Sequence, residues 1–125
     1  MPTLGQLSDS SSQAAQQLHD QGHFRSSVSR SYYACYSALT EHLVTRGTAF
    51  PGGYANPRHA HLPGYVTSGS FPSLDADAVR TVRRHIRYLY KFRLAADYEP
   101  GLDCGEAMAR EALRMLGSVR RELGV

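Results

Sequence analysis

Residues 22–47, GHFRSSVSRSYYACYSALTEHLVTRG, form a long stretch of helical periodicity with a glycine at each end and no proline inside. Glycine commonly ends helices, so this pattern predicts one helix from near His23 to Arg46. Steps of three and four residues place its apolar side chains on one face, namely Phe24, Val28, Tyr32, Cys35, Tyr36, Leu39 and Leu43. We therefore expect this face to lie in the core of an all-α protein.

The opposite face of the same helix carries small and aromatic side chains and little charge: Ser26, Ser27, Arg30, Tyr33, Ala34, Ser37 and Val44. A solvent-exposed face on so long a helix normally carries more charge. We expect the helix to pack on two sides, with the bundle core on one side and a further helix or a second subunit on the other. The second alternative predicts a homodimer.

Three other helices are predicted from their capping residues and periodicity. A short first helix is expected over about 12–20, with N-caps among Ser10–Ser12. A long helix should run from a cap at Ser73 to about Ala96, before Pro100. A last helix should begin at the D-x-x-E pattern of Asp103 and Glu106 and end near Gly124. These elements predict an antiparallel bundle of four to five helices over about 12–123.

The segment between the two long helices is rich in helix-breaking residues. Residues 47–73 contain four of the chain's six prolines and five of its glycines. We expect a long, mobile loop here, with a turn or two of helix in RHAHLPGYV, residues 58–66.

Size and composition indicate a single globular domain. The chain has 125 residues, of which 42% are hydrophobic and 20% charged, values typical of soluble domains. It contains no apolar run long enough for a membrane helix and no signal-peptide pattern. Its two cysteines, Cys35 and Cys104, are too few for a disulfide scaffold. We expect a cytoplasmic protein without a membrane partner or a cofactor.

The basic residues are unevenly distributed along the chain. Net charge is only +3, yet six of the fourteen basic residues lie between Arg80 and Arg93. Four of them share one stripe of the predicted third long helix: Arg80, Arg84, Arg87 and Lys91. Such a stripe is either a solvated helix face or a track for RNA phosphates, and the pattern alone leaves both open.

Arg93 belongs to a different face of that helix. It falls within about 20° of Ile86 on the helical wheel, at the end of an apolar stripe. Asp97 follows one turn later, and Tyr98 is its neighbour. The pair forms either an ion pair that closes the helix end or part of a site, in which Arg93 binds phosphate and Asp97 or Tyr98 handles protons.

Three further polar residues are candidates for contact with RNA. His59 and His61 are two residues apart, but no acidic or cysteine residue stands at a spacing typical of metal sites, so phosphate contact or loop polarity is favoured over metal binding. Arg30 shares a helix face with Tyr33 and Ser37. It either borders a dimer cleft or makes a structural contact with tyrosine.

Four segments, in order, resemble the HEPN domains, in particular the small stand-alone group known as UPF0332-like. They are GHFRSSVSRSYYACYSALTEHLVTRG (22–47), RHAHLPGYV (58–66), RLAADY (93–98) and the final EAMAREALRMLGSVRREL (106–123). The resemblance covers about residues 14–123. It implies an all-α bundle that dimerises.

The resemblance also implies a function in RNA metabolism. Many HEPN domains are metal-independent endoribonucleases that act as toxins or defence effectors, often beside a nucleotidyltransferase-type antitoxin or another operon partner. Arg93 matches the motif arginine that binds the scissile phosphate, and Asp97 and Tyr98 stand where later motif residues are expected. Residues 94–104 contain no histidine, whereas the catalytic motif has one that assists attack by the 2′-hydroxyl. His59, His61 or His85 would have to replace it in space, so a cleaving protein and a non-catalytic binding module both stay open.

Overall fold

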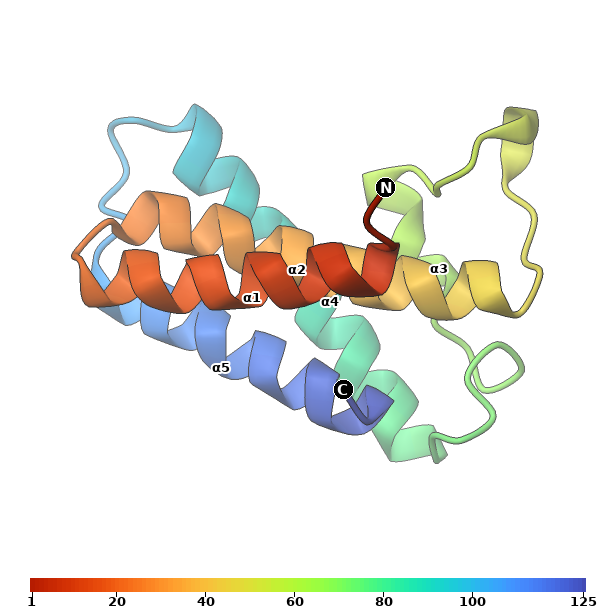
Figure 1. The fold of residues 1–125 in the computed structure, drawn as a ribbon. Helices are drawn as coiled ribbons and strands as arrows, with labels where there is room; N and C mark the ends of the chain where they lie inside the picture. Colours follow the sequence, from red (N-terminus) through yellow and green to blue (C-terminus); the bar gives the residue numbers. More distant parts are fainter.

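Helix α2 (Phe24–Thr45) lies at the centre of the fold and packs against α1 (Leu4–Asp20), α4 (Ala76–Tyr98) and α5 (Glu106–Leu123). The computed structural model describes residues 1–125 and contains no strand, which confirms the all-α prediction. In Figure 1, α1 lies along α2, α5 lies below this pair, and α4 crosses behind it. None of these helices combines the length and the apolar character needed to span a bilayer.

The prediction for the first helix was wrong at its start. Helix α1 begins at Leu4, and its N-cap is Thr3. The Thr3 hydroxyl accepts a hydrogen bond from the Gln6 amide at 3.0 Å, and the Gln6 side chain accepts one from the Thr3 amide at 2.8 Å. The T-x-x-Q pattern at residues 3–6 is therefore a capping box, and the bundle begins at residue 4 rather than near 12.

The longer α1 covers much of the second face of α2. The Ser27 hydroxyl donates to the Ala15 carbonyl, and the Ser8 hydroxyl donates to the Ala34 carbonyl, both at 2.7 Å. Small residues allow this close approach of the two helices. The partner on this side of α2 is thus a helix of the same chain, and part of the surface expected to contact a second subunit is already occupied.

Two other predicted caps were also wrong. The N-cap of α4 is Asp75, whose carboxylate accepts a hydrogen bond from the Ala78 amide at 2.7 Å, and not Ser73. Helix α5 begins after Gly105 without a side-chain cap, so the expected D-x-x-E box does not form. Its other end is as predicted, with Gly124 in the left-handed region at φ 75°.

The 47–73 segment is more structured than the expected loop. It contains two short 3₁₀ turns, η1 (Pro51–Gly53) and η2 (His59–His61), followed by the one-turn helix α3 (Leu62–Tyr65). The last two confirm the helical turn predicted in residues 58–66. The segment is anchored by buried apolar side chains: Phe50, Leu62, Val66 and Phe71. These anchors hold η2 against the core, where it can contribute to a site.

Candidate functional site

Arg93 lies on the inward face of α4, as its wheel position predicts, and only 13% of its side chain is exposed. Its Nη2 donates a hydrogen bond to the Tyr33 hydroxyl at 2.9 Å, and its Nε lies 3.1 Å from Asp97 Oδ2. Tyrosine rings surround the guanidinium carbon, with centroids 5.4 Å away for Tyr33, 5.5 Å for Tyr98 and 6.0 Å for Tyr32. The expected ion pair with Asp97 is present, and it is part of a larger aromatic cluster.

The charge of Arg93 is stabilised but its hydrogen-bonding capacity is not used up. Burial alone would lower the pKa of Arg93, but Tyr33, Tyr98 and Asp97 outweigh it and the pKa is raised. The Nε–H group, although close to Asp97, makes no directed hydrogen bond, so that contact is ionic. The buried Nε–H faces Asp97, and only one of the four N–H groups on Nη1 and Nη2 makes a hydrogen bond within the chain, so three donors are left for an anion.

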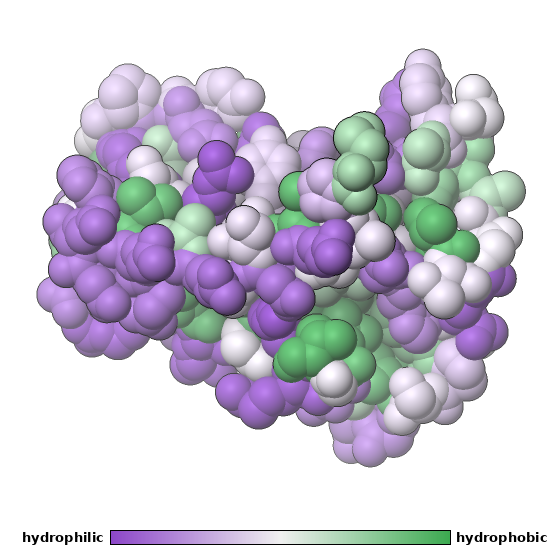
Figure 2. Space-filling view, in the orientation of Figure 1, coloured by the Kyte–Doolittle hydropathy of each residue, from purple (hydrophilic) through white to green (hydrophobic).

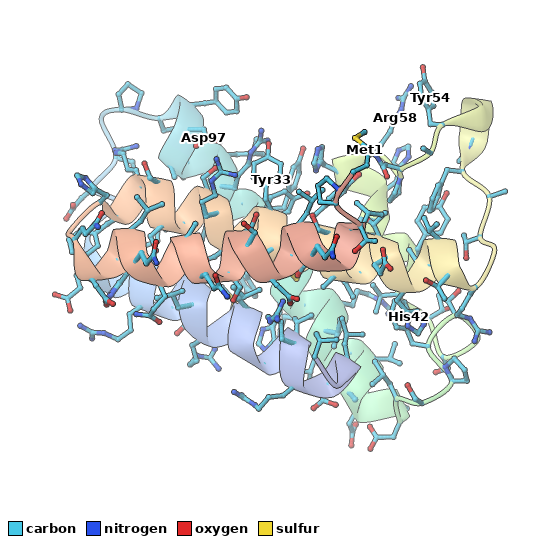
Figure 3. All side chains as sticks on the ribbon, in the orientation of Figure 1. Met1, Tyr33, His42, Tyr54, Arg58 and Asp97 are labelled. Carbon is cyan, nitrogen blue, oxygen red and sulfur yellow. The ribbon has the colours of Figure 1, made fainter.

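Helix α4 ends with Asp97 followed by Tyr98. Asp97 also accepts a weak hydrogen bond from the Ser29 hydroxyl at 3.3 Å, which ties its carboxylate to α2. Tyr98 is 66% exposed, and its hydroxyl makes no hydrogen bond. Figure 3 shows Tyr33 and Asp97 on the same side of the molecule, from α2 and from the end of α4.

Arg25 holds this end of α4 in place, a role that no sequence pattern predicts. Its Nη1 donates to the carbonyls of Ala96 at 2.9 Å and Glu99 at 3.2 Å, and its Nη2 donates to that of Leu102. The last carbonyls of a helix have no partner within the helix, and a cation there complements the helix dipole. Arg25 thus positions the segment that carries Asp97 and Tyr98.

His59 is the histidine that the fold brings to this cluster. Its Nδ1 lies 2.6 Å from the Tyr32 hydroxyl. Its ring packs on that of Tyr36 with centroids 4.4 Å apart and stacks on that of Tyr90 at 6.4 Å. Burial lowers the pKa of His59, and the nearby charge of Arg93 lowers it further. The imidazole is therefore neutral at neutral pH.

The contact with Tyr32 also indicates which nitrogen of His59 carries the proton. Tyr32 is completely buried, and its hydroxyl has no other polar partner. Burial raises the pKa of this phenol, so it keeps its proton and needs an acceptor. We infer that Tyr32 donates to Nδ1 and that the neutral imidazole carries its proton on Nε2.

His85 does not join the cluster. It is buried on the side of α4 that faces α5, where burial and the charges of Arg114 and Arg84 lower its pKa. The two thiols are also unsuited to nucleophilic chemistry, because burial raises the pKa of both Cys35 and Cys104.

The predicted basic stripe lines an open groove of about 410 Å³ on the outer face of α4, together with Arg83 and Tyr88. Arg80 pairs with Asp77, and Arg83 donates to the Val66 carbonyl from Nε at 3.1 Å and Nη2 at 2.7 Å. The other three members of the predicted stripe have no acidic partner: Arg84, Arg87 and Lys91.

A second groove connects the stripe with η2. It is lined by Ala60, His61, Pro63, Gly64 and Tyr90, and it shares Arg87 and Lys91 with the first groove. His61 therefore lies beside the stripe, while His59 faces the Arg93 cluster. Arg30 is exposed on α2 and makes no ion pair or side-chain hydrogen bond.

The upper surface of the molecule is hollowed between the lobe formed by the end of α4 and the lobe formed by residues 51–61 (Figure 2).

No group of three or more His, Cys, Asp and Glu side chains is arranged to hold a metal ion. In comparisons with known proteins, no family model, no curated protein and no solved structure matches this chain.

Proposed function

We propose that this chain is a HEPN-type RNA-related protein in which Arg93 binds a phosphodiester group. The observation that carries the proposal is a largely buried guanidinium that has one ionic partner, one hydrogen bond and free N–H donors. A planar guanidinium with donors to spare matches the oxygens of a phosphate. The order of the four HEPN-like segments supports the family assignment.

In its cleaving form the protein is a metal-independent endoribonuclease that acts as a toxin or defence effector. The 2′-oxygen attacks phosphorus, the bond to the 5′-oxygen breaks, and a 2′,3′-cyclic phosphate remains. Arg93 neutralises the charge that develops on the phosphate. The Asp97 carboxylate accepts the proton of the 2′-hydroxyl, and the exposed phenol of Tyr98 gives a proton to the leaving oxygen. The Nε2–H of His59 donates a hydrogen bond to a phosphate oxygen.

A second candidate is a non-catalytic HEPN module that binds RNA, a nucleotide or a partner protein and provides dimerisation. It is favoured by the inferred tautomer of His59, because an imidazole with its proton on Nε2 cannot accept a proton there. The lack of a histidine between residues 94 and 104 favours it as well. In this form Arg93, Asp97 and Tyr98 bind the anion and no bond is broken.

In both forms we propose a homodimer, with a nucleotidyltransferase-type antitoxin or another operon partner. Ser26 and Arg30 are exposed on α2, and Tyr33 is half-buried beside Arg93. A second copy that covers this surface would enclose the Arg93 cluster in a cleft. Light scattering should give the mass of a dimer at micromolar concentration, and a monomer mass would refute this part of the proposal.

Incubation with single-stranded RNA in the presence of EDTA tests the proposed site. We expect the wild-type protein to bind the RNA and, in the cleaving form, to release products with a 2′,3′-cyclic phosphate. A strand with 2′-deoxyribose at every position should be bound but not cleaved. Arg93→Ala should lose both activities, whereas Arg110→Ala, which removes an exposed arginine of α5, should keep them. Full binding and cleavage by a folded Arg93→Ala protein would refute the site.

A further inference from the structure

The outer face of α4 concentrates cations that nothing in the chain neutralises. Arg84, Arg87 and Lys91 lie within two turns of helix and have no acidic partner. The other arginines with neither an ion pair nor a side-chain hydrogen bond are scattered, with Arg30 on α2, Arg58 before η2 and Arg121 near the end of α5. A local excess of positive charge of this kind favours a polyanion.

This surface is connected to the Arg93 cluster. The groove that contains Arg87 and Lys91 is also lined by Tyr90. Tyr90 also contacts the cluster, because its ring is stacked on that of His59 and lies 5.6 Å from the Tyr32 ring. One aromatic ring, that of Tyr90, therefore separates the groove from the cluster, and a strand bound at Arg93 would pass this ring and His61 to continue along α4.

The dimensions fit a short stretch of nucleic acid. Residues 80–93 span about 20 Å of helix. That length accommodates on the order of four nucleotides, near the lower limit of site sizes in single-strand-binding folds.

Exposed aromatic rings accompany the cations along this path. Tyr88 is 47% exposed within the first groove, and Lys91 Nζ lies 5.7 Å from its ring centroid. Tyr98 is exposed at the far end. Bases can stack on such rings only when they are unpaired, and a positively charged groove with aromatic platforms is typical of proteins that bind single strands.

We infer that the outer face of α4 binds the single-stranded RNA segment that flanks the phosphate at Arg93, with phosphates along Arg84, Arg87 and Lys91 and a base on Tyr88. The inference rests on the proposed function. It adds that the substrate is single-stranded, that it extends about four nucleotides to one side of the Arg93 phosphate, and that its sequence is read weakly or not at all.

Fluorescence anisotropy with an uncleavable 2′-O-methyl RNA of roughly ten nucleotides tests the inference. The triple variant Arg84→Gln, Arg87→Gln, Lys91→Gln is compared with the α5 variant Arg110→Gln, Arg114→Gln, Arg121→Gln, which removes the same charge from exposed helix positions. We expect the α4 variant to bind at least tenfold more weakly. Its plot of log K against log salt should be shallower by about 2, because each phosphate contact on a single strand contributes about 0.7. The α5 variant should differ little from the wild type.

Two further measurements address the base contact and the strandedness. Tyr88→Ala should weaken binding of the single strand about fivefold or more and leave binding of a duplex of the same sequence unchanged. The wild type should bind the duplex more weakly than the single strand. Tighter binding of the duplex would overturn the inference.

The failure of the inference differs from the failure of the proposed function. If the wild type binds the single strand through Arg93 but the α4 and α5 triple variants behave alike, the track on α4 is refuted and the Arg93 site stands. If the wild type does not bind RNA, both are refuted. Circular dichroism and thermal unfolding confirm that each variant is folded, which is expected because all the substituted side chains are exposed.

Discussion

Helices α4 and α5 are both rich in arginine, but they differ in how many neighbouring arginines have an acidic partner. In α5, Arg110 pairs with Glu106 and Arg114 pairs with Glu111, each one turn earlier on the same helix. In α4, Arg84 and Arg87 have no such partner. Arginines with an acid one turn away neutralise themselves and form an ordinary solvated surface. Arg84 and Arg87 have no such neighbour and remain free to bind an anion, so the difference between the helices indicates where function lies.

The two helices also end differently. Helix α5 ends on a left-handed glycine, Gly124, whereas the end of α4 is held by the Arg25 side chain from α2. A glycine cap needs nothing from the rest of the chain. The Arg25 clamp fixes the end of α4 relative to α2, and the Arg93 cluster is built from these two helices.

The largest expected effect sharpens this contrast. Arg25→Ala should lower the free energy of unfolding by about 2–3 kcal/mol, because several carbonyls would lose a charged hydrogen-bond donor. Arg121→Ala, at an exposed position of α5, should change it by less than about 0.5 kcal/mol. Chemical denaturation measures both values. In hydrogen exchange, the amides of Glu99 and Leu102, which donate to the carbonyls of Ala95 and Glu99, should lose protection in Arg25→Ala, and unchanged exchange there would contradict the clamp.

Exchange of arginine for lysine should separate the two kinds of arginine. Lysine keeps the charge but not the planar pair of donors, so we expect Arg93→Lys to weaken RNA binding at least tenfold, or about 1.4 kcal/mol. Arg84→Lys, on the outer face of α4, should reduce binding less than threefold, since a phosphate track needs mainly charge. Equal effects at both positions would remove the distinction between a shaped site and a charged surface.

Tyr98 should affect chemistry more than binding. Tyr98→Phe keeps the ring that contacts the Arg93 guanidinium, and we expect RNA binding to stay within about twofold of wild type. Loss of cleavage with retained binding would identify the hydroxyl as the proton donor. If Tyr98→Phe cleaves like the wild type, that role is excluded, and if it no longer binds, the hydroxyl is a ligand of the anion.

The smallest effect concerns pH. The pKa of His59 is lowered in the folded protein by burial and by Arg93, and Tyr32, Tyr36 and Tyr90 also surround its ring. Below its unfolded pKa of about 6.5, the unfolded chain binds more protons than the folded one, so stability should fall as pH drops from 7 toward 5. His85 should contribute in the same direction.

The contribution of His59 can be isolated with His59→Phe, which keeps an aromatic ring in the cluster. The free energy of unfolding of this variant should decrease by less than that of the wild type between pH 7 and pH 5. The difference is expected because the pKa of His59 is lowered in the folded protein and not in the unfolded chain. An identical pH dependence would show that His59 is not held in its neutral form by the fold.

The sequence predicted the features that depend on periodicity. The extent of α2, the inward position of Arg93 and the pairing of Arg93 with Asp97 follow from the geometry of a single helix, and all three are present in the structure. The all-helical fold follows from the same patterns and the absence of strand-like alternation.

The features that were missed depend on contacts between distant segments. The sequence named His59, His61 and His85 as alternatives for this position but could not choose between them. His59 reaches the Arg93 cluster because residues 47–73 are anchored to the core, and no spacing rule connects residue 59 with residue 93. Arg25 acts on carbonyls about seventy residues away in the chain, so its role is invisible until α2 and α4 are packed. The start of α1 was missed for a different reason: the prediction rested on the serines at 10–12, although the T-x-x-Q box is present at residues 3–6.

Nuclear magnetic resonance of arginine side chains can show whether Arg93 binds a phosphate. The Nε–H signal of Arg93 is assigned by its loss in Arg93→Lys and is followed while an uncleavable 2′-O-methyl RNA is added. If Arg93 binds the phosphate, this signal should show a saturable shift at the concentration at which the RNA binds, with no comparable shift for Arg110 or Arg114. Saturated RNA binding with an unmoved Arg93 signal would show that Arg93 is not a phosphate ligand and leave the Arg93–Asp97 pair as a structural ion pair.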